Sequence, residues 1–233
     1  MTAMLKENIA KVRARIDTAA TAAEREGHEI NLELAVKTRS AETILTACEA
    51  LQDAGLPLML GHNHVQEAQA TVPVIREKYP TAEIHMIGHL QKNKINKALE
   101  NVDLIETIDS PQLLEALAKR VPVGRILPVY IEVNTSGETA KSGAQPGTAT
   151  LELAAAVEEH DDLSLAGLMT VGAITDSETV ARSCFDTLAE MREQIDSSLE
   201  LSMGMSHDME WAIKSGATIV RIGTDVFGPR DYR

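Results

Sequence analysis

One lysine, Lys37, stands where an amine could do chemistry. It ends the stretch NLELAVK, residues 31–37, which alternates apolar and polar side chains as a half-buried strand does. In such a strand Glu33 and Ala35 lie on the same face as Lys37. A neutral lysine amine forms a Schiff base with an aldehyde, whereas a lysine at a strand end can also simply reach into solvent. From this stretch alone both interpretations stay open.

Two glycine-containing segments near the end of the chain could bind a phosphate group. In SMGMSHDM, residues 202–209, Gly204 precedes Ser206, which we expect to cap a helix. In RIGTDVFG, residues 221–228, Gly223 and Thr224 offer backbone N–H groups and a hydroxyl. Parallel barrels often bind phosphate between their last two strands with such groups.

Glycines that end strands and serines that cap helices are also common for structural reasons alone. Neither segment is therefore specific by itself. Together with an inward lysine, however, they favour a ligand that carries an aldehyde at one end and a phosphate at the other. Pyridoxal phosphate has both groups.

The elements that must position these residues alternate between strand and helix. After a helix over residues 2–27, eight segments have strand patterns, and each but the last precedes a helical segment. We expect the strands at 31–37, 56–62, 82–88, 102–108, 125–134, 163–171, 199–204 and 218–224. We expect the helices between them at 41–54, 65–78, 91–100, 111–120, 148–160, 177–197 and 208–215. Ser40 and Ser110 are expected caps, and Pro73 predicts a kink or break.

This alternation predicts parallel strands joined by helical crossovers, and eight strands are the number that closes a barrel. We therefore expect a single-domain (β/α)8 TIM barrel over residues 1–233, with an extra N-terminal helix. An open doubly wound sheet is the alternative. In a barrel, Lys37 and both glycine segments would meet at the carboxyl end of the strands, where such folds carry their active sites.

Composition excludes several classes of function. The formal charge of -13 opposes binding to nucleic acid or to an anionic membrane, and an aromatic content of 3% argues against a base-stacking surface. The first residues are charged throughout and do not resemble a signal peptide, and no apolar run is long enough to span a membrane. The two cysteines, Cys48 and Cys184, have no metal-type spacing. We expect reduced thiols and a soluble, cytoplasmic protein.

Several motifs, taken in order, resemble those of the pyridoxal phosphate homeostasis protein family. They are AVKTRS, GHNHVQEA, IHMIGHLQKNK, VNTSGETAKSG, GLMTVGA and LSMGMSHDMEWAIKSGATIVRIGTDVFGPRDY. The resemblance covers almost the whole chain, and the last motif is the most specific. It implies a barrel similar to the amino-terminal domain of alanine racemase, with pyridoxal phosphate held as an aldimine on Lys37.

The same resemblance implies roles for other residues. Arg221 would lie against the pyridine nitrogen, Gly223 and Thr224 would hold the phosphate, and Asn63 would be a polar group beside the cofactor. The full set of expected cofactor-binding residues is Lys37, Asn63, Ser202, Gly204, Ser206, Arg221, Gly223 and Thr224. No metal is implied.

The chain also departs from the family pattern at three positions. Gly61-His62-Asn63 stands where the family usually has Gly-Glu-Asn, Ser40 replaces a common proline, and His89 replaces another. The glutamate of the family pattern is therefore absent at position 62.

Two hypotheses for the function follow from the resemblance. The chain is either a carrier that holds pyridoxal phosphate and releases it to apo-enzymes, or an amino-acid racemase or decarboxylase. The pKa of an arginine exceeds about 12, so Arg221 would leave the pyridine largely unprotonated and a weak electron sink. A racemase also needs a second base. Of Tyr79, Tyr130 and Tyr232 none is obviously placed for it, and Tyr130, expected in the interior, stays open as a candidate.

The chain ends at Arg233, directly after the eighth strand, so we expect the second domain of alanine racemase to be missing. An open barrel would leave the cofactor in water, which favours slow release and the carrier hypothesis. A third hypothesis is a barrel that has lost the cofactor. Intact Lys37 and both phosphate segments argue against it.

The remaining polar clusters have simpler interpretations. Histidines near the ends of the second and third strands suggest polar lining around the mouth rather than a zinc site, because their spacing matches no zinc motif. These histidines are His62, His64, His85 and His89. In the fifth strand Tyr130, Glu132 and Asn134 are candidates for the interior, with Glu132 as a structural carboxylate. Lys92, Asn93, Lys94 and Lys97 suggest a solvated helix face or, alternatively, a second phosphate or partner site.

Overall fold

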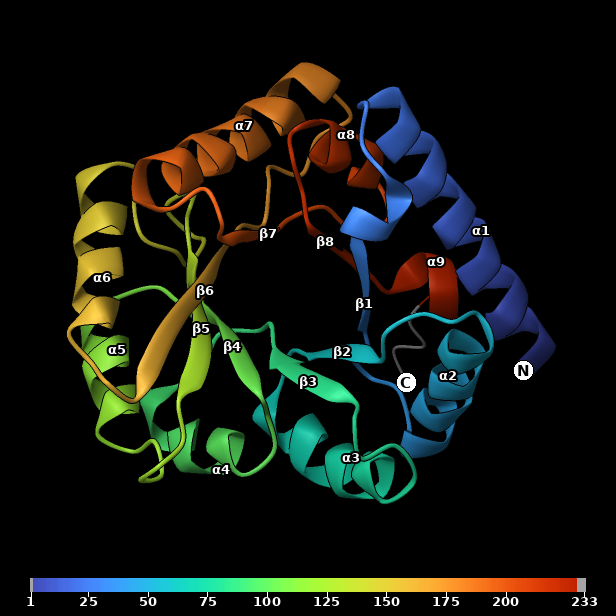
Figure 1. Cartoon of the computed structure of the whole chain (residues 1–233), viewed down its shortest axis with the longest axis horizontal. Coiled ribbons are helices and arrows are strands. Elements are labelled where there is room, and N and C mark those ends of the chain that lie inside the picture. Colours follow the sequence, from blue (N-terminus) through green and yellow to red (C-terminus); the bar gives the residue numbers. More distant parts are fainter. Residues whose placement is uncertain (1, 230–233) are drawn as a thin grey trace.

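Eight parallel strands close into a barrel in which each strand pairs with its neighbours in chain order and β8 pairs with β1 (Figure 1). The structure, a computed structural model, describes residues 2–229. The strands are β1 (Asn31–Ala35), β2 (Met59–His62), β3 (Glu83–Met86), β4 (Leu104–Ile108), β5 (Leu127–Glu132), β6 (Leu163–Met169), β7 (Glu200–Ser202) and β8 (Ile219–Ile222). The expected (β/α)8 barrel is thereby confirmed, and the open sheet is wrong.

Helices surround the barrel on the outside (Figure 1). They are α1 (Thr2–Ala22), α2 (Ala41–Asp53), α3 (Val65–Lys78), α4 (Ile95–Leu99), α5 (Pro111–Ala118), α6 (Thr148–Glu158), α7 (Glu178–Ile195), α8 (Met209–Lys214) and α9 (Thr224–Phe227), with short 3-10 turns η1 (Gly27–Glu29) and η2 (Lys92–Lys94). None of the helices within residues 2–229 combines the length and apolar character that a membrane crossing requires.

The extra helix α1 takes the place of a full helix after β8. Because α9 is only four residues long, it cannot cover β8 by itself. α1 packs against α2, α8 and α9 and buries an apolar stripe at helical spacing, which consists of Leu5, Ile9, Val12, Ile16, Ala19 and Ala20. Expected to run to Gly27, it ends at Ala22, just before Glu24 adopts a φ of 56°.

Two local expectations concern α3 and α8. Pro73 lies inside α3, so the expected break is wrong, and buried Val72 and Ile75 hold the continuous helix against the core. Ser206 does not cap α8, because Asp208 occupies that position and accepts a 2.7 Å hydrogen bond from the Met205 N–H.

Two further expectations concern helix starts. Ser110 precedes α5 but makes no capping bond, since its hydroxyl donates to Asp109 instead. The strand expected to reach Thr224 ends at Ile222, and Thr224 begins α9. The expected cap Ser40 is confirmed, because its hydroxyl oxygen accepts the Thr43 N–H at 3.3 Å.

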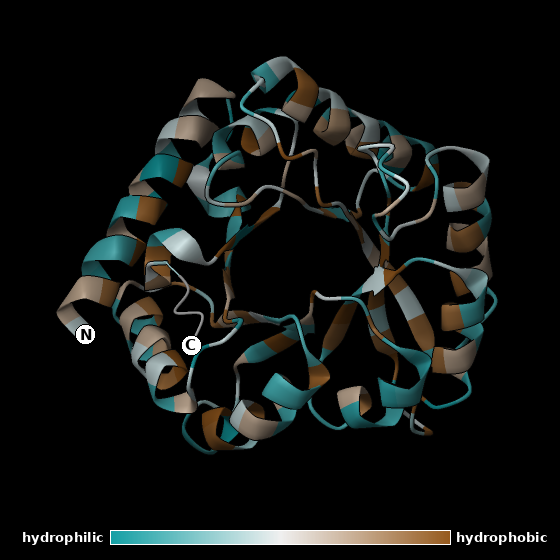
Figure 2. Ribbon diagram, turned by 180° about the vertical axis from the view of Figure 1, so that it is seen from behind, coloured by the Kyte–Doolittle hydropathy of each residue, from teal (hydrophilic) through white to brown (hydrophobic). Residues whose placement is uncertain are grey.

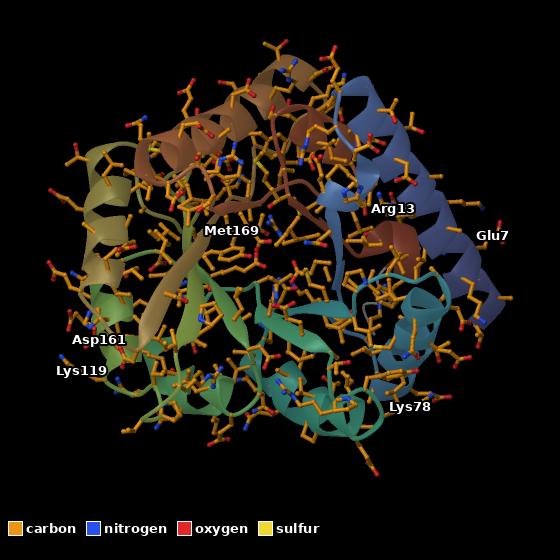
Figure 3. The ribbon with its side chains drawn as sticks, viewed as in Figure 1. Glu7, Arg13, Lys78, Lys119, Asp161 and Met169 are labelled. Atoms are coloured by element: carbon orange, nitrogen blue, oxygen red, sulfur yellow. The ribbon has the colours of Figure 1, made fainter. Side chains whose placement is uncertain are left out.

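The chain has two apolar layers. The larger one lies between the sheet and the amphipathic helices (Figure 2), and Glu7, Lys78 and Lys119 point outward from the helical layer (Figure 3). The smaller one lies inside the barrel, by strand alternation on the same face as Glu106 and Arg221. It contains Met59, Leu104, Tyr130, Met169 and Ile219. The rest of the barrel interior is polar, and it leads to the site.

Candidate functional site

A cavity of about 210 Å³ opens at the carboxyl ends of β1 and β8, beside the loop that follows β7. This is the end of a parallel barrel at which active sites form. Its lining residues are Ala35, Lys37, Arg39, Met205, Ser206, His207, Arg221, Gly223 and Thr224.

The lining of this cavity is positively charged in a protein of strong negative charge. Lys37, Arg39 and Arg221 contribute cationic groups, and none of the lining residues is acidic. A local surplus of positive charge attracts an anion even where the whole molecule repels it. The cavity therefore suits a small anionic ligand.

Strand pairing and a tight turn place Lys37 in the lining of this cavity. β1 pairs with β8 so that Glu33 lies opposite Arg221, which brings Ala35 level with Gly223. At Gly223 an added Cβ would lie 3.2 Å from the Ala35 carbonyl oxygen, so glycine lets the two segments approach closely. Directly after Lys37, Thr38 adopts a φ of 62°, a left-handed conformation that is unfavourable for a β-branched residue.

Arg221 is held by two hydrogen bonds. Its side chain donates to the hydroxyl of Ser202 at 2.7 Å and to the carbonyl oxygen of Thr170 at 2.7 Å. Only 5% of the residue is exposed. The guanidinium group is therefore fixed at the floor of the cavity before any ligand binds.

The two loops expected to bind phosphate lie against each other. The hydroxyl oxygen of Ser206 accepts the Asp225 N–H at 3.4 Å. From α1, Arg15 donates to the Ser206 carbonyl oxygen at 3.0 Å, to Glu210 at 2.8 Å and to Asp225. One arginine thus braces both loops from outside the barrel, and its carboxylate partner Glu210 is the main cause that raises its pKa.

The structure brings together five of the eight expected cofactor-binding residues. Those that line the cavity are Lys37, Ser206, Arg221, Gly223 and Thr224. Ser202 lies beneath Arg221, and Gly204 supports the β7 loop with a φ of 93° and a carbonyl oxygen that accepts the Arg221 N–H at 3.0 Å. An added Cβ at Gly204 would lie 2.5 Å from the Cβ of Ala212.

Asn63 is the expected residue that stays apart. It lies half-buried in the loop after β2 and does not line the cavity. Sequence reasoning in turn missed Arg39, Met205 and His207. Arg39 follows Lys37 by two residues, but strand alternation could not have placed it, because the turn at Lys37 and Thr38 interrupts the extended backbone. For the other two, the irregular loop gives no periodic signal.

A layer of charged side chains lies inside the barrel below Arg221. Glu33, His85 and Glu106 are each 0% exposed. His85 Nδ1 lies 2.8 Å from Glu106 and 3.1 Å from Glu33, and Ser202 donates to Glu106 at 2.6 Å. Burial, together with the Glu106 carboxylate, raises the pKa of Glu33 to about 7. Burial alone would lower the pKa of His85, but contacts with Glu106, Glu33 and Glu83 raise it.

The four histidines expected around the mouth do not line the cavity. His85 lies within the charged layer because β3 continues to Met86, and His62 is fully buried at the end of β2. Both ring nitrogens of His62 lack hydrogen-bond partners within residues 2–229, and burial lowers its pKa to about 4. His64 and His89 are exposed.

Strand β5 supplies structural polar groups. Glu132 accepts a 2.8 Å hydrogen bond from Ser142, and burial raises the pKa of this carboxyl group. Tyr130 is fully buried and donates to Glu200, and burial and this carboxylate together raise the pKa of its hydroxyl. Neither side chain lines the Lys37 cavity. The basic cluster at Lys92–Lys97 is mostly exposed, which agrees with a solvated helix face.

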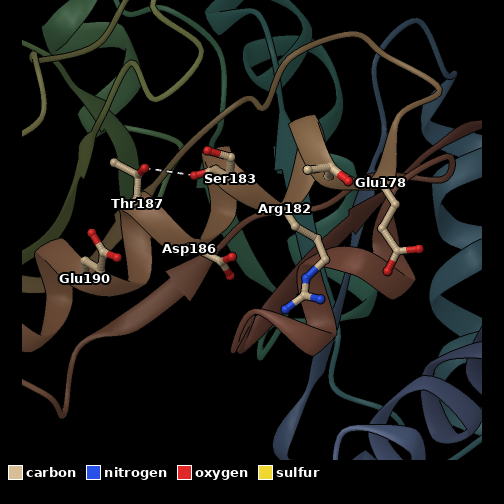
Figure 4. Close-up of a pocket in the computed structure, with 7 residues that line it drawn as sticks. Glu178, Arg182, Ser183, Asp186, Thr187 and Glu190 are labelled. Atoms are coloured by element: carbon tan, nitrogen blue, oxygen red, sulfur yellow. Dashed lines mark hydrogen bonds between the residues drawn. The ribbon is translucent and has the colours of Figure 1, made fainter.

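A larger hollow of about 610 Å³ lies on α7 (Figure 4). All of its lining residues belong to this one helix, and within it Thr187 donates to the Ser183 carbonyl oxygen at 2.8 Å. The side chains include both acidic groups and Arg182. Because no second element converges on it, this hollow is an open helix surface, and the cavity at Lys37 is the better candidate site.

Comparisons with known proteins agree with this fold. Residues 3–231 match the family model described as alanine racemase, N-terminal domain. The chain is 37% identical to the pyridoxal phosphate homeostasis protein of Vibrio cholerae over 235 residues, which cover 98% of this chain and 97% of that protein.

Two solved structures extend the comparison. A protein of unknown function from Bifidobacterium adolescentis is similar with a TM-score of 0.90 and 37% identity, over 97% of this chain and 95% of that one. PipY of Synechococcus elongatus, solved with PLP bound, is similar with a TM-score of 0.79 and 28% identity, over 96% of this chain and 100% of that one.

Proposed function

The chain belongs to the pyridoxal phosphate homeostasis protein family, and from this premise we propose that its cavity binds pyridoxal 5'-phosphate with Lys37 as the covalent anchor. One observation carries the proposal: an amine, a fixed guanidinium group and the hydroxyls of two braced loops line the same positively charged cavity. The cofactor, when bound, supplies a reactive aldehyde, a pyridine ring and a phosphate.

Each lining group has a partner on such a molecule. The Nζ atom of Lys37 bonds to the aldehyde carbon as a Schiff base, and one water molecule leaves. Ser206, Gly223 and Thr224 donate to the phosphate. Arg221 faces the pyridine nitrogen, positioned by its hydrogen bonds to Ser202 and Thr170.

The site suits holding the cofactor better than catalysis on it. Arg221 cannot hand over a proton readily, because the pKa of a guanidinium group exceeds about 12. Tyr130 cannot act as a second base from its place, since it is buried and bonded to Glu200. No tyrosine within residues 2–229 lines the cavity, and Tyr232 lies outside the described residues.

The protein is therefore a carrier or buffer in intracellular vitamin B6 homeostasis. The half-buried position of Lys37 lets water and a recipient reach the Schiff base, so the bound cofactor can be released. Its partners are apo-forms of pyridoxal phosphate enzymes in the cytoplasm. A racemase or decarboxylase remains the alternative hypothesis, to be separated from the carrier by experiment.

Absorption spectroscopy tests the cofactor site. Wild-type protein loaded with pyridoxal phosphate and freed of excess ligand should show the visible band of a lysine Schiff base. Lys37→Ala should lose this band, whereas Lys97→Ala, which removes an exposed lysine, should keep it. A band that persists in Lys37→Ala, or that is missing from the wild type, refutes the assignment.

Transfer assays test the carrier role. The loaded protein should restore activity to an apo-enzyme in the presence of a phosphatase that destroys free pyridoxal phosphate, and the Lys37→Ala variant should not. Racemisation or decarboxylation of amino acids at ordinary enzyme rates, about 1 to 1,000 per second, would instead establish the alternative.

A further inference from the structure

The charged layer inside the barrel holds three metal-type donor atoms in one place. Glu33 on β1, His85 on β3 and Glu106 on β4 each offer a ligand atom, and these atoms all lie within 4.8 Å of one another. The Nδ1 atom of His85 is 2.8 Å from Glu106 Oε1 and 3.1 Å from Glu33 Oε1. Two ligands of a tetrahedral Zn²⁺ ion lie about 3.3 Å apart, so small side-chain rotations would admit an ion.

Glu33 provides an independent sign that a partner belongs here. It is 0% exposed, and its Oε1 lies 3.1 Å from His85 Nδ1, but that nitrogen forms its hydrogen bond with Glu106, so neither Glu33 oxygen has a hydrogen-bond partner within residues 2–229. A buried carboxylate without donors is costly, and proteins satisfy such groups with an ion or a hydrogen bond. A cation between Glu33, His85 and Glu106 supplies what is missing.

The surroundings resemble the outer shell of a metal site. His85 Nε2 lies 3.2 Å from Glu83 Oε1, which directs Nδ1 toward the interior. The second oxygen of Glu106 accepts the Ser202 hydroxyl at 2.6 Å, and Ser202 in turn accepts from Arg221 at 2.7 Å. Metal-binding histidines and carboxylates are oriented by such contacts. The charges also balance, because a divalent ion and Arg221 together offset Glu33, Glu83 and Glu106 when His85 is neutral.

We propose that Glu33, His85 and Glu106 bind one divalent transition-metal ion in the barrel interior, beneath the Lys37 cavity. One imidazole and two carboxylates suit Zn²⁺, Co²⁺, Fe²⁺ or Mn²⁺ better than Ca²⁺ or Mg²⁺, which prefer oxygen ligands alone. Three protein ligands leave a coordination position open for water. Glu106 and Ser202 connect the ion to Arg221 through hydrogen bonds, so the ion affects the electrostatic environment of Arg221 at the floor of the cavity.

Metal titration of the untagged, full-length chain tests the proposal without pyridoxal phosphate. After a chelator has removed any metal, the wild type that is given Zn²⁺ and then dialysed against metal-free buffer should retain about one Zn²⁺ per chain, measured by elemental analysis, with a rise in melting temperature. Co²⁺ in place of Zn²⁺ should give visible absorption bands. If the wild type retains no metal, Glu33 is simply a protonated buried acid, and the proposal is overturned.

Variants locate the ion. Glu33→Gln and Glu106→Gln should weaken Zn²⁺ binding by more than about 100-fold, and Glu83→Gln, which alters only the contact to Nε2, by about 10- to 100-fold. His89→Gln is the matched control, because it removes an exposed imidazole that lies 3.5 Å from Asp109. Equal binding in Glu33→Gln and wild type, or loss in His89→Gln, overturns the site.

X-ray absorption at the zinc edge of the wild type keeps the test decisive if a core variant fails to fold. One nitrogen and several oxygen neighbours support the site. Sulfur neighbours or several imidazoles refute it.

Discussion

The space outside the sheet and the space inside it are built from different residues. Between the sheet and the helices, nearly every buried side chain is apolar, as with Leu51, Ile75 and Phe185. Inside the barrel, a small apolar cluster around Tyr130 shares the space with ionisable side chains. The difference shows that the outer layer supplies most of the burial that stabilises the fold, which frees the interior to hold charges for binding.

Each layer also contains an exception. His62 shares the outward face of β2 with Leu60, which packs in the outer layer, yet its nitrogens have no partners within the described residues. In the interior, Glu33 is an exception, because both of its carboxylate oxygens lack a hydrogen-bond partner within residues 2–229. His62 and Glu33 make the comparison testable, because a substitution of either should have a different effect from a substitution of the other side chains in its layer.

Truncation of a large outer side chain should have the largest effect on stability. Phe185→Ala removes a fully buried ring from the layer between sheet and helices and should lower the free energy of unfolding by about 3–5 kcal/mol. Urea denaturation measures this loss. Lys37→Ala, in the interior cavity, should change it by less than about 0.5 kcal/mol. Equal losses of unfolding free energy in the two variants would show that the outer layer does not stabilise the fold more than the interior cavity does.

The outer exception should make the protein sensitive to acid. His62 has a pKa of about 4 in the folded protein against 6.5 in its ordinary state, so between these values the unfolded chain binds more protons. Stability should be unaffected above pH 6.5, fall as the pH drops toward 4, and lose roughly 3 kcal/mol from this residue in total.

The His62→Leu variant tests whether His62 causes this acid sensitivity. It should flatten that part of the pH profile and, at pH 7, stabilise the protein by about 1 kcal/mol, since it removes unpaired buried polar atoms. Denaturation at a series of pH values measures both effects. An unchanged acid limb in His62→Leu would assign the sensitivity to other groups.

Loss of an interior hydrogen bond should lower the free energy of unfolding less than loss of the buried Phe185 ring in the outer layer. Tyr130→Phe removes the hydroxyl that donates to Glu200 but keeps the buried ring, and it should cost about 1–2 kcal/mol of unfolding free energy. The folded variant should bind pyridoxal phosphate as the wild type does, because Tyr130 does not line the cavity. A loss of cofactor binding would place Tyr130 in the site after all.

The sequence predicted the barrel well because its cause is local and repeated. Each observed strand lies within its expected segment, since alternation and helical periodicity mark every unit. α9 was missed because four residues are too few to show a period. Lys37 could be placed on the interior side from parity in β1, although the residue itself lies beyond the end of that strand.

The parts that could not be predicted depend on contacts between distant segments. His85 was expected at the rim, but the register of β3 with β4 places it among Glu33 and Glu106, and no local pattern reveals that meeting. Ser206 looked like a cap because its residue type is favourable, yet Asp208 took the position. Arg15 gave no signal at all, since its partners lie about 190 residues or more further along the chain.

Arg15 allows a last and smaller test, in which the outer layer acts on the inner site. Its bonds to Ser206 and Asp225 hold the two phosphate loops together, so Arg15→Gln should leave them less ordered before the ligand binds. The pairs are partly exposed, and solvent weakens them, so we expect only a three- to tenfold rise in the Kd for pyridoxal phosphate, about 1 kcal/mol. Lys11→Gln is the control, because it removes an equal charge from an exposed pair on the same helix. If both variants bind alike, net charge rather than bracing sets the affinity. If only Arg15→Gln is weakened, then α1 does more than replace a missing helix, because it also fixes the loops that receive the phosphate.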